Sequence, residues 1–108
     1  MSLHVVLDKK GKRIPDSEAE EYVKDRILLF QIKPPEEDTW VFIANELPIL
    51  YFRWYVKTGV LKYSEVFFYD RETDPDLSKK ISVDINGEIS NYPGSFLSRY
   101  SDVLRKLI

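Results

Sequence analysis

The residues best suited to chemistry in this chain are carboxylates that follow a predicted buried strand. Asp70, Glu72, Asp74 and Asp76 alternate along a short loop. Clustered carboxylates are the ligands that hard cations such as Mg²⁺ or Ca²⁺ prefer. The loop is therefore the first candidate for a metal site, and its plainer interpretation is a solvated surface loop.

The spacing of these carboxylates excludes a calcium-binding helix–loop–helix motif. Counted from Asp70, the sixth position is Pro75 where the motif has Gly, and the twelfth is Ile81 where it has Glu. A looser metal site made of Asp70, Glu72 and Asp84 would suit a metal-dependent nuclease or another phosphoryl-transfer enzyme, although the D…(D/E)xK pattern is missing. This enzyme is the first alternative function.

Other catalytic classes lack the residues that they need. The chain has no cysteine, which excludes disulfides, thiolate zinc sites and cysteine nucleophiles. The only histidine, His4, lies near the N-terminus, so we expect no His-based triad or metal site. Glycines stand far apart at Gly11, Gly59, Gly87 and Gly94, so they form no phosphate-binding loop. We expect no catalytic residue, no cofactor and no enzymatic activity.

Charge is segregated along the N-terminal quarter of the chain. Residues 8–13 carry four positive charges and one negative, and residues 16–25 carry five negative charges and one positive. The net charge of −2 argues against a nucleic-acid binder, which usually has a clustered basic face. Binding of nucleic acid through the basic arm Lys9–Arg13 is the second alternative function.

Composition bounds the class of protein. With 108 residues, 44% of them hydrophobic and 14% aromatic, the chain is expected to form a single domain over residues 1–108. We find no signal peptide and no apolar run near the ~20 residues of a membrane helix, so we expect a cytoplasmic protein and no membrane partner. Abundant charged residues beside few Asn, Gln and Met are typical of heat-adapted proteins.

The N-terminal half predicts two strands and two helices. His4–Leu7 is a short strand that ends in a turn at Asp8–Gly11. A helix follows from Ser17 to about Phe30, with a capping box formed by Ser17 and Glu20. Thr39–Ala44 favours a strand buried on both faces. Asn45 then caps a helix that stops at Gly59.

The C-terminal half predicts two more strands and a third helix. Glu65–Tyr69 is a second buried strand, reached from Thr39–Ala44 by a parallel crossover. Lys80–Ile85 alternates like a half-exposed strand, and Asn86-Gly87 predicts a two-residue hairpin turn with positive φ at both positions. A helix begins at Pro93. The fold class is therefore mixed α/β, with one mixed sheet of about four strands, three helices and the order β-α-β-α-β-β-α.

The second helix carries the strongest interaction signal. Apolar side chains surround Leu47–Val56 almost completely, so the helix must be covered on several sides. A small single sheet covers one side well, and Tyr, Trp and Arg are enriched in interface hot spots. We expect this helix to form an interface with a partner, and the alternative is that its apolar side chains are all buried inside the domain. Its predicted residues, from this helix and the last one, are Tyr51, Trp54, Tyr55, Phe96 and Tyr100.

The stretch V-D-I-N-G-E-I-S-N-Y-P-G-S-F-L, Val83–Leu97, resembles an uncharacterised domain at the C-terminus of AAA/ABC-type P-loop ATPases. Tyr92 stands where that domain usually has Trp, and Gly94 comes one place early. Trp40–Asp70 is similar to the end of the ATPase core, with Ala44-Asn45-Glu46 where the Thr-His-Ser switch would stand. The phosphate loop and the signature motif are absent. The resemblance implies a relative that cannot hydrolyse ATP but docks on an ATPase or on another copy of itself.

These observations predict a non-enzymatic protein-interaction module. Its expected partner is itself, as a homodimer, or a P-loop ATPase to which it is an accessory.

Overall fold

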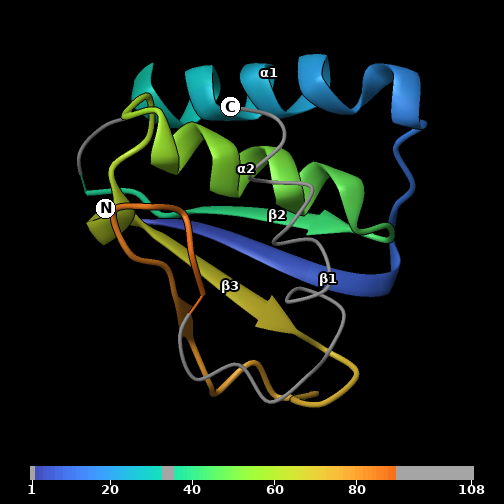
Figure 1. Ribbon diagram of the computed structural model, residues 1–108. Helices are drawn as coiled ribbons and strands as arrows, with labels where there is room; N and C mark the ends of the chain where they lie inside the picture. Colours follow the sequence, from blue (N-terminus) through green and yellow to red (C-terminus); the bar gives the residue numbers. More distant parts are fainter. Residues whose placement is uncertain (1, 33–35, 90–108) are drawn as a thin grey trace.

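The computed structural model describes residues 2–32 and 36–89. They form a four-stranded mixed sheet in the order β2-β1-β3-β4. Two α-helices run side by side across one face of this sheet (Figure 1). The third predicted helix, from Pro93, lies outside the described residues. The elements are β1 Leu3–Lys12, η1 Asp16–Glu18, α1 Ala19–Ile32, β2 Thr39–Ile43, α2 Leu47–Lys57, η2 Tyr63–Glu65, β3 Val66–Asp70 and β4 Ile81–Ser82.

β1 is the central strand of the sheet. It is parallel to β2 on one side and to β3 on the other, and Val5 lies opposite both Val41 and Phe68. β4 pairs antiparallel with β3 and places Ile81 beside Phe68. The predicted crossover from β2 to β3 therefore passes over β1, and β2 is left at the edge of the described sheet.

The hydrophobic core lies between the sheet and the two helices. Alternate strand residues face the helices because successive side chains of a strand point to opposite faces. They meet the inner faces of α1 and α2, and Phe30 and Phe52 are completely buried. This layer includes Leu3, Val5, Val41, Ile43, Val66 and Phe68 from the strands, Val23, Ile27 and Phe30 from α1, and Ile49, Phe52 and Val56 from α2.

The other face of the sheet carries mostly rings, and we call it the aromatic face. Its two rows follow the register of the strands: His4 lies between Trp40 and Phe67, and Val6 lies between Phe42 and Tyr69. His4, Val6 and Tyr69 are buried, whereas Trp40 is 45% exposed and Phe42 is 38% exposed.

The prediction that Thr39–Ala44 is buried on both faces is wrong. Residues of β2 alternate between buried and exposed, with Thr39, Val41 and Ile43 buried and Trp40 and Phe42 exposed. The continuous apolar run led to the wrong inference because an edge strand can carry large apolar side chains on a face that is only partly covered.

Several local predictions also differ from the structure. Asp8–Gly11 is not a turn, since β1 continues to Lys12 with an irregular register after Leu7. Ser17 makes no cap, because it lies inside η1, for which no side-chain cap is found. Asn45 also does not cap α2. Its amide instead binds the backbone N–H and C=O of Ile14, at 2.9 and 2.7 Å.

The turn at Asn86-Gly87 is longer than predicted. The backbone N–H of Asp84 donates to Glu88 O, and that of Gly87 donates to Asp84 O. These bonds close a three-residue hairpin loop in which Gly87 has φ +76°, while Asn86 does not have positive φ. The predicted end of α2 is confirmed, since Gly59 follows Thr58 with φ +83°.

Candidate functional site

The outer edge of β2 combines unpaired backbone with exposed rings. The N–H of Thr39 donates to Ser2 O across the β1–β2 pair. In a parallel ladder, alternate residues bond to the neighbouring strand, so Thr39, Val41 and Ile43 face β1. Trp40 and Phe42 therefore direct their N–H groups away from β1. The end of β1 covers the C-terminal part of that side, because Lys12 pairs with Ile43 and its carbonyl accepts the Ala44 N–H at 2.9 Å.

The exposed rings of β2 are ordered by their neighbours on the aromatic face. Trp40 stacks on His4 at 4.1 Å between centroids and 13° between planes. Phe42 lies 6.3 Å from Trp40 with its plane inclined by 17°. The guanidinium of Arg71 lies 5.9 Å from the Phe42 ring and is also bound to Asp8 at 2.8 Å. A contact at this edge would meet side chains that are already held in position.

His4 is at the centre of a hydrogen-bond chain that the sequence analysis missed. Its Nδ1 lies 2.8 Å from the Tyr69 hydroxyl, and its Nε2 lies 3.2 Å from Asp38 Oδ2. The hydrogen bond to His4, with one from the Ser2 N–H, lowers the pKa of Asp38, while burial raises the pKa of Tyr69. Because His4 is buried beneath Trp40, we interpret this chain as support for the start of β1 and β2.

The predicted interface helix is mostly turned inward. Tyr55 is 6% exposed and belongs to the hydrophobic core, and Tyr51 and Trp54 are half-buried against that core. The indole N–H of Trp54 and the hydroxyl of Tyr55 are buried and have no hydrogen-bond partner among the described residues. Phe96 and Tyr100 lie outside those residues. An interface through α2 therefore stays a prediction, with little exposed area to support it.

A second apolar surface lies at the C-terminal half of α1. A shallow pocket of about 200 Å³ is lined by Ile27, Leu28 and Tyr55, together with Val60 from the loop after α2. Leu28 is 58% exposed and Val60 is 51% exposed. This surface offers side chains alone, whereas the edge of β2 also offers backbone hydrogen-bond donors.

The carboxylates predicted as metal ligands make local contacts. Asp70 is buried and accepts hydrogen bonds from the Glu72 N–H and the Thr73 hydroxyl. Glu72 forms an ion pair with Lys9, with 2.5 Å between the charged atoms. Asp84 accepts the N–H groups of residues 86 and 88 within its own turn. Within residues 2–32 and 36–89, no group of three or more His, Asp or Glu side chains is placed to hold a metal.

The predicted basic arm is the end of β1 and the segment after it. Lys9 and Lys10 are exposed, and Lys9 is neutralised by Glu72. The ammonium of Lys12 lies over the Tyr22 ring, 5.4 Å from its centroid. Acidic and aromatic neighbours therefore engage two cations of the arm.

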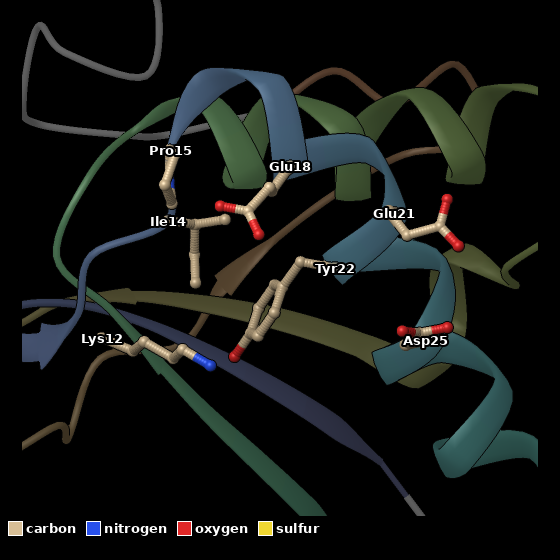
Figure 2. Close-up of a pocket in the computed structure, with 7 residues that line it drawn as sticks. All are labelled: Lys12, Ile14, Pro15, Glu18, Glu21, Tyr22 and Asp25. Atoms are coloured by element: carbon tan, nitrogen blue, oxygen red, sulfur yellow. The ribbon is translucent and has the colours of Figure 1, made fainter.

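A pocket of about 210 Å³ lies where the end of β1 meets α1 (Figure 2). Lys12 and Tyr22 point toward one another inside it. Glu18, Glu21 and Asp25 lie along its outer side and are exposed to solvent. Burial raises the pKa of Tyr22, so its hydroxyl is held neutral and is poorly suited to act as a base. The seven lining residues give no nucleophile with a base beside it.

Arg53 is the most deeply buried charged side chain among the described residues. It extends from α2 to the hairpin turn, where its Nε donates to Gly87 O at 2.9 Å and its Nη2 lies 3.5 Å from Glu88 Oε2. Burial lowers the pKa of Arg53, against the opposing effect of Glu88 and Asp84. The interaction ties the turn at Gly87 to α2.

No protein-family model, no curated protein and no solved structure matches this chain. In the described part of the chain, neither helix is long and apolar enough to cross a membrane.

Proposed function

We propose that this protein is a non-enzymatic interaction module that joins its partner along the edge of β2. The partner is a second copy of the chain or a P-loop ATPase. One observation supports this proposal above the others: β2 is an uncharged edge strand with two exposed rings, Trp40 and Phe42. Lys12 covers only the end of this edge, beside Ile43 and Ala44. Edge strands that expose apolar side chains and carry no charge are prone to contact another chain.

The edge of β2 is a better contact than α2 on physical grounds. A partner there contacts two exposed rings and can accept the outward N–H of Trp40. The rings of α2 are already covered, so a partner there would gain less. The resemblance to the C-terminal part of P-loop ATPases supports an ATPase as one of the two partners.

The proposal is tested by purifying tagged protein from its source cells and weighing the assemblies by mass spectrometry. The edge variant Trp40→Lys/Phe42→Lys places two charges on β2, and the matched control Ile85→Lys changes a residue that is 66% exposed elsewhere. We expect the parent and the control to keep a stoichiometric partner that the edge variant loses. Equal assemblies from all three proteins would reject the edge as the contact.

A further inference from the structure

We propose that the aromatic face of the sheet binds a single-stranded nucleic acid, with bases stacked on Trp40 and phosphates held by Arg71 and Lys80. The inference goes beyond the proposed function, because it gives the exposed rings a second ligand and adds two cations from outside β2. Proteins that bind single strands without sequence preference combine these two elements, rings on which bases stack and cations that follow the backbone.

A stack of three rings crosses the sheet from its edge. Trp40 lies against His4 with 13° between their planes, and Phe67 lies on the other side of His4 at 5.9 Å and 24°. The indole therefore has one face covered by His4 and the other turned toward the edge of the sheet. The end of β1 covers this edge beside Ile43 and Ala44, further along the strand. A base that stacks on the outer face of Trp40 continues the row of rings.

Two cations lie over other rings of the same face. The ammonium of Lys80 is 4.7 Å from the centroid of the Phe67 ring, and the guanidinium of Arg71 is 5.9 Å from that of Phe42. Lys80 shares this face because Ile81, the next residue, points into the core. Both cationic side chains are exposed, so a phosphate can reach them from solvent.

The acidic charge of the chain is concentrated on the opposite layer. Residues 16–25 carry five negative charges, and they belong to η1 and α1, which lie on the helical face of the sheet (Figure 1). Three carboxylates that flank the strands each contact a basic side chain: Asp8 with Arg71, Glu72 with Lys9, and Asp38 with His4. The net charge of −2 therefore does not describe the aromatic face.

A nucleic acid fits this face better than an uncharged ligand. A neutral sugar chain stacks on rings but gains little from the cations above them. A single strand uses both, because its bases stack while its phosphates meet Lys80 and Arg71. Arg71 donates to Asp8 through Nη1, and a guanidinium has further N–H donors for a phosphate.

Fluorescence polarisation of labelled oligouridylate and oligothymidylate, each about ten nucleotides long, tests binding to the full chain. We expect both single strands to bind at low salt, and each to bind less tightly once paired with its complement, because paired bases are not free to stack. The tighter of the two single strands distinguishes RNA from DNA as the source. Failure of both to bind, or equally tight binding of the duplexes, would overturn the proposal.

Substitution of Trp40 tests the stacking surface. Trp40→Ala should weaken binding about ten-fold, whereas Trp40→Phe keeps a ring and should weaken it much less. Circular dichroism of both variants should match that of the parent. Equal affinities of the parent and a folded Trp40→Ala would overturn the proposal.

Substitution of Lys80 tests the phosphate contact. Lys80→Gln should weaken binding and lower the slope of log affinity against log salt by about 0.7, the contribution of one phosphate on a single strand. The matched control is Lys24→Gln on α1, where the ammonium lies 3.9 Å from Glu20, and it should change neither quantity. An unchanged slope in Lys80→Gln, or an equal change in Lys24→Gln, would overturn the proposal. This pair decides the question if Trp40→Ala does not fold.

Failure of this inference is distinguishable from failure of the proposed function. Lys80→Gln lies outside β2, so it should lose affinity for the oligonucleotides and keep the protein partner from cells. A parent that binds no oligonucleotide but keeps that partner, which Trp40→Lys/Phe42→Lys loses, would reject the inference alone. A parent that binds oligonucleotides through Trp40 and Lys80 but keeps no protein partner would reject the proposed function alone.

Discussion

The two edge strands of the described sheet, β2 and β4, differ in length and in the side chains that they expose. β2 offers five uncharged residues, with Trp40 and Phe42 exposed. β4 is only two residues long, Ile81–Ser82, and the ammonium of Lys80 beside it lies 4.7 Å from the Phe67 ring centroid. Short edges with nearby lysine resist pairing with other chains. On the proposed function, β2 is the edge that meets a partner, through Trp40 and Phe42.

The side of the sheet near β4 is stabilised from within the chain. Val83 and Ile89 form an antiparallel bridge, and Arg53 holds the turn between them against α2. The edge of β2 is supported at its C-terminal end, where Lys12 O accepts the Ala44 N–H and the Asn45 amide binds the backbone of Ile14. Mutations near the turn should therefore affect folding, and mutations on the outer face of β2 should affect assembly.

The largest expected effect is that of Arg53→Ala. The variant leaves Gly87 O without its buried donor and opens a cavity under the turn, which together cost about 3 kcal/mol of unfolding free energy. Urea unfolding measures this loss. A change below about 0.5 kcal/mol, the range of ordinary surface substitutions, would show that Arg53 does not hold the turn.

Gly87→Ala should cause the next largest loss of unfolding free energy. Gly87 has φ +76°, and an added Cβ would collide with the backbone oxygen of Arg53. Gly59→Ala is the matched control, because Gly59 has φ +83° but nothing within 4 Å of an added Cβ. Both lose about 1 kcal/mol from the left-handed backbone, and Gly87→Ala loses about 1 kcal/mol more from the collision. Equal midpoints in thermal melts of the two variants would contradict the close contact.

Trp40→Lys should have a smaller effect on the fold than on assembly. It removes the stacking of Trp40 on His4, worth about 1 kcal/mol, while the ladder between β1 and β2 remains. Chemical unfolding of the parent and the variant below the concentration of assembly measures this cost. A loss as large as that of Arg53→Ala would make the ring part of the core and weaken the contrast between the edges.

The smallest expected effect is the pH dependence lost in Asp38→Asn. The pKa of Asp38 is held below its ordinary value of 3.8, mainly by the hydrogen bond to His4. A lowered folded pKa stabilises the protein above about pH 4, and this stability is lost as the pH falls through the folded value. The unfolding midpoint of the parent should therefore fall more steeply with acid than that of the variant. Parallel curves would show that the contact with His4 does not form.

Much of the fold could be predicted from local pattern. The alternating and helical spacings located both helices and all four strands of the described residues, and Gly59 marked the end of α2. The order of the strands could not be predicted, because it depends on β3 docking beside β1. Without that order, the apolar run of β2 was taken for a strand buried on both faces, although its rings lie at an edge.

The candidate site was hidden for the same reason. His4 acquires its environment from Asp38 and Tyr69, which are 34 and 65 residues away in the chain. Arg53 interrupts an apolar helix, and only the distant turn at Gly87 explains its burial. The apolar side chains of α2 were predicted to be buried on several sides, and they pack mostly against the core between the sheet and α1.

Amide hydrogen exchange, measured residue by residue by NMR, tests the central claim most directly. The N–H groups of Val41 and Ile43 face β1 and should be protected at every protein concentration. Those of Trp40 and Phe42 should be protected in the assembled protein and should exchange rapidly after dilution. Rapid exchange of Trp40 and Phe42 at all concentrations, in a protein that still assembles, would place the contact elsewhere and contradict the account.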